Sequence, residues 1–466
     1  MKPLLIVLFL ISVSHSLEHT ELHSLVSGSP LFTGRDNYNV YDVAGSPLGH
    51  FQKGITRLSL SSSFDRLGWN QGIDSDLEGN WFSAPLLRAG EPQTAFFELF
   101  YHPAVMSVQN SVTSEKLRLP LHRFGLTLGG KSRSDVIQVS LTATGFYGKQ
   151  SMALSDNERI KMGLDLIRID LATRIHELAS LGFHIGGDAQ IDTLFGSTGY
   201  ADRWFKGHAP ALGAYIDFGN EDFPLRSIAA FDYSISRFLY VSPLGDNDAI
   251  RNDSIAFRWQ TTGDINAADF LFEPAFLFGI SNNRTKLFYP TESNDNPFNL
   301  GTERGFNWNE MKTQIGFGTS VGLKEYVTLW GEYLFTGRVL KPGENFLTED
   351  MNRSAHLVNI GIRTDIHNYA LQLKDSRLSP RIGFFFQDSH SNNPFPHPFT
   401  SSNQFWRYNP DLTFSVYQKT SGFLLGLEGS AGEHFIYDMY LSFLNRDSED
   451  ISRSGTGFGL KVGLEL

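Results

Sequence analysis

The sequence predicts an all-β fold: a transmembrane, antiparallel, up-and-down β-barrel of about 14–18 strands, with a short N-terminal non-strand segment. Three observations support this prediction. The last strand alternates strictly between apolar and small or charged residues, and hairpins with short turns recur along the chain. In addition, no apolar run after residue 16 approaches the length of a membrane-spanning helix. A chain that spans lipid without such helices must be a closed barrel.

Alternation is clearest in residues 456–466. Phe458, Leu460, Val462, Leu464 and Leu466 share one parity, and Gly, Lys and Glu occupy the other. Because side chains of a strand alternate between two faces, one face is wholly apolar. This segment resembles the closing strand of bacterial outer-membrane β-barrels, although it ends in leucine where an aromatic residue is usual. The resemblance implies recognition of strand 456–466 by the barrel insertion machinery. The last strand of a soluble β-sandwich would alternate in the same way.

The N-terminus predicts export through a cleaved signal peptide covering residues 1–16. Lys2 precedes an apolar run over residues 3–11, and Ser14 and Ser16 provide small residues before a cleavage site at Leu17. The run is too short to span a bilayer. No cysteine follows it, which excludes a lipoprotein anchor. The expected localisation is therefore the outer membrane.

Composition fits a barrel in contact with outer-membrane lipids. Aromatic residues make up 13% of the chain, including 39 Phe, yet the mean hydropathy is −0.20. Apolar residues facing lipid, with polar residues in the lumen and loops, explain both values. The formal net charge of −11 argues against a nucleic-acid partner. The chain has no cysteine, which excludes disulfides, thiol nucleophiles and thiolate metal sites.

We expect three regions: the signal peptide (1–16), an N-terminal periplasmic or in-barrel segment (17–50) and the β-barrel (51–466). Residues 39–49 resemble the loop before the first strand of long-chain fatty-acid transporter-like barrels, with Ser46-Pro47-Leu48 where those usually carry Asn-Pro-Ala. That resemblance implies a hydrophobic solute. An ordinary turn is the alternative interpretation.

From residue 55 the pattern is strand, turn, strand. Two early strands (55–64 and 94–101) precede five hairpins with short turns, and these are separated by long hydrophilic loops at 148–160, 194–210, 242–253, 281–310 and 339–354. Short turns on one side and long loops on the other are typical of outer-membrane barrels. In the last third, predicted strands at 357–364, 369–373, 382–387, 405–418, 422–429 and 435–443 conflict with up-and-down parity. One of them must therefore be wrong.

Alternation also predicts which residues face the lumen. On four central strands the outward sets are aromatic or aliphatic, which leaves Arg258, Glu273 and Glu332 inside among apolar residues. A mixed inner surface suits amphipathic or hydrophobic solutes. A structural network of ion pairs is the alternative.

Two strands break the regular pattern. In residues 161–173 the apolar parity changes, so a one-residue bulge near Leu166 would direct Asp165, Arg168 and Asp170 inward. Pro274 lies within a phenylalanine-rich strand and predicts a bulge in the wall, because proline donates no ladder hydrogen bond. Such a bulge could form a lateral exit or be a harmless irregularity.

No catalytic residues, metal ligands or cofactor are predicted. The 14 His are scattered, and neither a Gly-x-Ser-x-Gly nor a His-Glu-x-x-His motif occurs. We therefore expect a non-enzymatic outer-membrane barrel for passive passage of small hydrophobic or amphipathic molecules. The alternative is a non-transporting barrel that anchors or organises a surface or secretion complex through its long loops.

Overall fold

The computed structural model describes residues 30–31, 58–71, 75–91, 95–110, 116–132, 136–152, 155–195, 203–219, 223–242, 245–287, 306–323, 326–342, 351–367, 376–391, 417–432, 434–448 and 452–465. The fold is all-β. No helix among these residues is long and apolar enough to cross a membrane.

Every strand belongs to one antiparallel sheet. The strands are β1 (Leu58–Gln71), β2 (Ser75–Glu91), β3 (Ala95–Asn110), β4 (Lys116–Lys131), β5 (Ile137–Met152), β6 (Ser155–His176), β7 (Ala179–Phe195), β8 (Arg203–Phe218), β9 (Leu225–Ser242), β10 (Gly245–Gly263), β11 (Ile265–Ala267), β12 (Phe270–Leu287), β13 (Phe306–Leu323), β14 (Val327–Pro342), β15 (Met351–Thr364), β16 (Ile366–His367), β17 (Arg377–Ser391), β18 (Tyr417–Ala431), β19 (Phe435–Ser448) and β20 (Ser452–Glu465).

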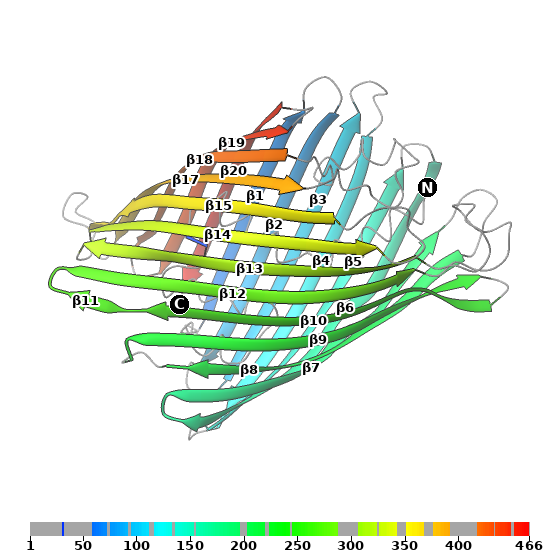
Figure 1. Cartoon of the computed structure of the whole chain (residues 1–466), viewed down its shortest axis with the longest axis horizontal. Helices are drawn as coiled ribbons and strands as arrows, with labels where there is room; N and C mark the ends of the chain where they lie inside the picture. The colour runs from blue at the N-terminus through cyan, green and yellow to red at the C-terminus, as the bar shows by residue number, and fades with distance from the viewer. Residues whose placement is uncertain are drawn as a thin grey trace.

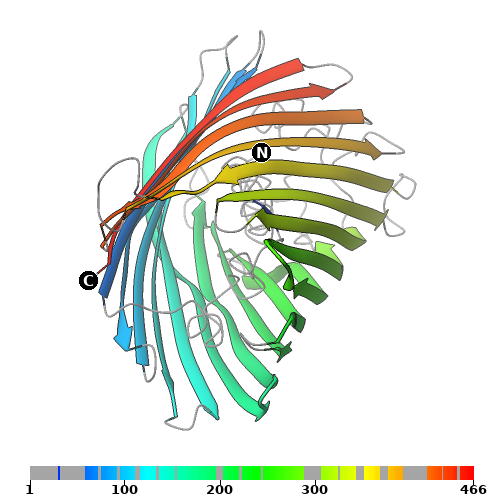
Figure 2. The same cartoon turned by 90° about the vertical axis from the view of Figure 1, so that its left-hand side faces the viewer.

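The sheet closes on itself as a barrel. Each strand pairs with the next along the chain, and β20 pairs with β1 from Ser59↔Glu465 to Gln71↔Arg453. Among the described residues, the 20 strand segments form 18 strands, because β11 continues the register of β10 and β16 continues that of β15. This lies within the predicted range. Figures 1 and 2 show the strands running side by side around the wall, with the first and last strands adjacent.

The two faces of the wall differ as the alternation predicts. Outward residues are large, apolar and exposed, for example Phe257, Ile315, Phe317 and Phe458. Inward residues of the same strands are mostly buried, and many are polar, such as Gln260, Ser320 and Glu332. Of β20, Gly457, Gly459 and Gly463 face inward and are buried. A continuous apolar exterior around a polar interior is the arrangement of a transmembrane barrel and the reverse of a soluble one.

The sequence missed one strand, β2. Its pairing with β3 shifts by one residue between Trp81↔Ala104 and Leu87↔Leu99, and Pro85 lies within this irregular stretch. Proline and a bulge together disturb the period of two, which hid the strand from pattern reading.

The loops are shorter than predicted, since the strands extend beyond the apolar stretches. β9 ends at Ser242 and β10 begins at Gly245, so most of the predicted loop 242–253 is strand. β5, β6, β12, β13, β14 and β15 likewise take residues from the loops predicted at 148–160, 281–310 and 339–354. Main-chain pairing continues where both faces of a strand are polar. Those parts of a strand show no alternation of hydropathy, so the sequence pattern does not reveal them.

The parity conflict in the last third is resolved by β18. Residues 417–418 and 422–429, assigned to two predicted strands, belong to this one strand. The predicted strand 369–373 and residues 405–416 lie outside the described residues. With β17 and β18 as single strands, β17 ends and β18 begins at the end of the barrel opposite the end of β20.

One of the two predicted irregularities occurs. β5 and β6 shift register between Thr144↔Leu166 and Gly145↔Leu164, so the bulge predicted near Leu166 is confirmed, with Asp165 as the extra residue.

The bulge predicted at Pro274 is wrong. Pro274 pairs with Thr319 within an unbroken register from Phe270↔Leu323 to Leu287↔Phe306. On its other side the register also continues from β10 into β11. The ladder is interrupted there at Gly263 and Asp264, opposite Pro274 and Glu273, and the Asp264 N–H donates to the Pro224 carbonyl at 2.7 Å. Pro274 is tolerated because it lies close to the turn at residues 268–269, and the unbroken register removes the basis for a lateral exit there.

Candidate functional site on the inner wall

The inner surface of β10, β12 and β13 carries two of the predicted lumen charges. Arg258 and Glu273 both have the inward parity and are half-buried. Glu273 Oε2 accepts a hydrogen bond from the Ser320 hydroxyl of β13. Leu271 and Leu277 flank Glu273 on the same face and are also half-buried, so charge and apolar surface alternate here.

Glu332 on β14 is almost fully buried, with 4% of its surface exposed. Its Oε2 accepts hydrogen bonds from Asn359 Nδ2 and from the backbone N–H of Leu31, both at 2.7 Å. Part of the N-terminal segment therefore contacts the inner wall. Two donors to one carboxylate oxygen offset the cost of burying the charge. Glu332 thus has a structural role in addition to its position on the lumen side.

A row of polar side chains crosses β6 to β9. Asp170 pairs with His184, His184 with Gly213, and Gly213 with Asp232. Because Gly213 has no side chain, the imidazole of His184 spans β8, and its Nε2 lies 3.0 Å from Asp232 Oδ1.

Arg168 completes this row. It binds Asp170 through Nε and Nη2, the latter at 2.6 Å, and Asp170 is fully buried. In contrast, 48% of the Asp232 side chain is exposed. The row therefore presents an anionic group to the lumen at one end and a satisfied ion pair at the other. Asp165 lies in the bulge of β6, and its side chain is outside the described part of the chain.

A second cluster, which the sequence analysis did not identify, lies on β15 to β19. It is near the end of the barrel at which β1 begins and β20 ends. Arg381 binds Asp438 Oδ1 at 2.7 Å and Glu428 Oε2 at 3.4 Å. Asp365 binds Arg377 at 2.7 Å and accepts from the Ser379 hydroxyl. Arg381 lies 47 and 57 residues from Glu428 and Asp438, so the register of β17, β18 and β19 brings these three together.

Asp365, which lies between β15 and β16, has an altered pKa. Burial alone would raise it, but the hydrogen bonds from Ser379 and Arg377 and the charge of Arg363 outweigh burial and lower the pKa. The carboxylate is therefore held ionised in this network.

The inner face of β14 to β19 also carries large apolar side chains. Those that are buried are Trp330, Leu334, Leu357, Phe385, Leu424, Tyr440 and Leu444. Phe385 and Trp330 lie over glycines of the neighbouring strands, Gly422 and Gly361. The interior is thus amphipathic, with ionic groups on β6 to β9 and both ionic and large apolar groups on β14 to β19. Such a surface can hold an apolar body and orient one ionised group.

No protein-family model and no curated protein matches the chain. It is similar to the crystal structure of Pseudomonas aeruginosa OccK2 (OpdF) in complex with glucuronate, with 10% identity, 89% of this chain and 100% of that chain covered, and a TM-score of 0.39. The CymD monoaromatic hydrocarbon channel has 9% identity, 95% and 96% coverage and a TM-score of 0.38. Pseudomonas aeruginosa OpdK with vanillate has 10% identity, 88% and 100% coverage and a TM-score of 0.37.

The fold is that of an outer-membrane β-barrel. The segment 39–49, whose sequence resembles fatty-acid transporter-like barrels, lies outside the described residues. That resemblance stays a prediction, as do the signal peptide and the insertion machinery as a partner.

Proposed function

We propose that the chain is an outer-membrane channel for passive passage of small hydrophobic or amphipathic molecules. The observation that supports this most is the mixed inner surface of β10 to β13, where half-buried Leu271 and Leu277 alternate with Arg258 and Glu273. The wall of a general, water-filled diffusion pore is expected to be polar throughout. A solute with an apolar body gains by contacting them, and the nearby charges orient its polar group.

The exposed carboxylate of Asp232 is the group expected to select by charge. It extends from the inner face of β9 toward the lumen, and its Oδ1 lies 3.0 Å from His184 Nε2. Removing its charge should favour anions over cations, because like charges repel along a narrow path of low dielectric.

Uptake into proteoliposomes tests the proposal with three solutes of similar size: benzenesulfonate, phenyltrimethylammonium and arabinose. Both aromatic ions are permanently charged, so neither crosses lipid as a neutral form. We expect both to enter faster than arabinose, and Asp232→Asn to raise the ratio of anion to cation flux about threefold or more. Phe231→Leu, next to Asp232 but facing outward, is the matched control and should leave the ratio unchanged.

Flux of arabinose as fast as that of the aromatic ions would contradict selectivity for amphipathic molecules. No flux of any solute would favour a second function, a barrel that anchors or organises a surface complex. The full burial of Phe385 and Leu424 on the inner face supports that second function, since side chains with this little exposure do not line an open pore.

A further inference from the structure

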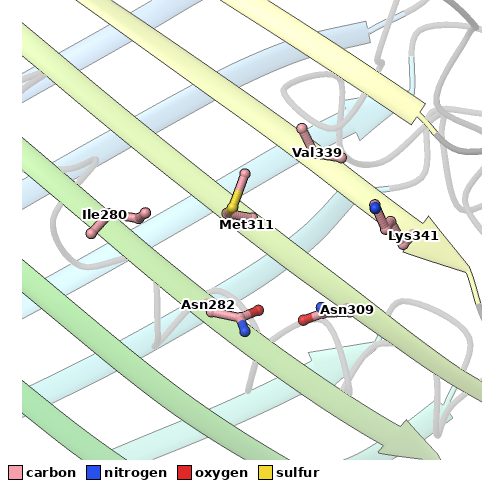
Figure 3. A pocket seen from close by; sticks show the side chains of 6 residues that line it. All are labelled: Ile280, Asn282, Asn309, Met311, Val339 and Lys341. Carbon is pink, nitrogen blue, oxygen red and sulfur yellow. The ribbon is translucent and has the colours of Figure 1, made fainter.

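The outer surface of the barrel has a hollow of about 320 Å³ over β12, β13 and β14. It is lined by Ile280, Asn282, Asn309, Met311, Val339 and Lys341 (Figure 3). All six share the parity of the exposed residues Ile280, Met311 and Ile315. The hollow therefore faces the membrane and is separate from the lumen.

Polarity changes in steps across this surface. Phe276, Phe317 and Tyr333 pair side by side in the apolar part of the barrel. Further along the strands come Asn282, Met311 and Val339, and then Arg284, Asn309 and Lys341. The hollow lies between the last two rows and the aliphatic side chain of Ile280. An apolar region of aromatic and aliphatic side chains, two asparagines and a cationic border follow the same order as acyl chain, sugar and phosphate in a glycolipid.

The position along the barrel agrees with a headgroup site. Phe270 to Ile280 spans roughly ten residues of β12, which at about 3.4 Å per residue and a tilt of about 40° gives about 26 Å, close to the thickness of the apolar band. Arg284 and Lys341 are exposed just beyond it. Connections 288–305 and 343–350 leave the strands at this end, whereas β1 begins and β20 ends at the opposite end.

Asn309 points to the chemistry of the headgroup. Its side chain lines the hollow, and a side-chain amide offers a ligand there both a donor and an acceptor. Asn282, on the adjacent strand, faces Asn309 with its own amide (Figure 3). Two amides offer both donors and acceptors, which suits hydroxyl groups of a sugar better than a phosphate alone.

We propose that this hollow binds a phosphorylated glycolipid of the leaflet at the long-loop end. Arg284 and Lys341 bind the phosphate, Asn282 and Asn309 bind sugar hydroxyls, and an acyl chain lies on Ile280, Met311 and Val339. The proposal rests on the outer-membrane location proposed above but not on transport. Its test measures binding alone, so it can fail or succeed independently of solute passage.

Native mass spectrometry of the full chain in detergent tests the site with three probes: diphosphoryl lipid A, its dephosphorylated form and phosphatidylglycerol. We expect diphosphoryl lipid A to bind most tightly, and the double variant Arg284→Gln, Lys341→Gln to weaken it about tenfold. Lys419→Gln, an exposed lysine at the start of β18, is the matched control and should change little. Asn309→Leu should weaken lipid A binding and leave phosphatidylglycerol unaffected.

Four outcomes would overturn the proposal: unchanged binding by the double variant, an equal loss in Lys419→Gln, equal binding of the dephosphorylated probe, or phosphatidylglycerol bound as tightly as lipid A. A heat-dependent mobility shift on gels first establishes that each variant is folded. If the double variant does not fold, Lys341→Gln alone should weaken lipid A binding about threefold, and unchanged binding would again overturn the proposal.

Discussion

At the scale of single residues, the inner wall depends on large side chains lying over glycines. Trp330 covers Gly361 of the paired strand, and a Cβ added at Gly361 would lie 2.0 Å from the Trp330 ring atom Cζ2. The glycine is therefore needed for close approach and not for an unusual backbone angle. The indole occupies the space that a second side chain would take, which fixes its position in the apolar part of the interior.

Gly361→Ala should destabilise the barrel by about 1–3 kcal/mol, because the indole must move within a packed interior. Gly331→Ala is the matched control: Gly331 is next to Trp330 but faces outward, and its added Cβ would come no closer than 4.0 Å to Ile360. The measurement is the temperature to which a sample must be heated before the band of the folded barrel disappears from the gel. Equal effects of the two substitutions would contradict a role for the indole contact.

For single residues, the sequence predicts which face of the wall each side chain lies on and no more than that. Arg258, Glu273 and Glu332 were placed inside by alternation, and all three have the inward parity in the structure. The partners of these residues could not be found in this way. Ser320, Asn359 and Leu31 lie 47, 27 and 301 residues away from the carboxylates that they contact.

At the scale of strands and turns, the cluster of Asp365, Arg377 and Ser379 joins the end of β15 to β17. The Asp365 N–H also donates to the Tyr326 carbonyl at 2.7 Å, which connects the turn before β14 to the same cluster. Since the pKa of Asp365 is lowered in the folded state, the ionised carboxylate stabilises this end of the barrel.

Stability should therefore depend on pH. A group with a lowered folded pKa contributes its full stabilisation above its unfolded pKa of about 3.9, and that contribution is lost as pH falls through the folded pKa. We expect the temperature at which the folded band disappears from the gel to decrease once the pH is below about 4. Asp365→Asn should lower it at pH 7 and reduce this acid sensitivity, whereas Glu177→Gln, exposed in the β6–β7 turn, should do neither. An unchanged acid response in Asp365→Asn would show that other carboxylates dominate.

The strands themselves were predictable where one face contacts lipid and the other does not. The bulge near Leu166 was visible because the apolar residues change parity there. Outside the apolar band both faces are polar, so the outer parts of β10, β13 and β15 carried no such signal. The bulge predicted at Pro274 is wrong for a related reason. The cost of a proline depends on its distance from the end of the strand, and the sequence pattern places that end too far from Pro274.

At the scale of the whole molecule, the exposed apolar exterior is stable only in contact with the acyl chains of a lipid bilayer. Phe317 is 57% exposed and lies near the middle of the apolar band, between Phe276 and Tyr333. In water a charged residue at this position would cost little or even help solubility. In a bilayer, arginine near the midplane costs about 2–4 kcal/mol, and the cost falls to about 0–1 kcal/mol near the interface.

Phe317→Arg should therefore lower the free energy of unfolding by about 2–4 kcal/mol in lipid vesicles, measured by denaturant titration of tryptophan fluorescence. Leu323→Arg is the matched control, since Leu323 is also outward and 40% exposed but lies at the end of β13, paired with Phe270 and Val327. We expect it to cost less than half as much. A depth-dependent cost is specific to a bilayer, so equal small effects at both positions would mean that this surface faces water or a protein partner and that the barrel does not span a membrane.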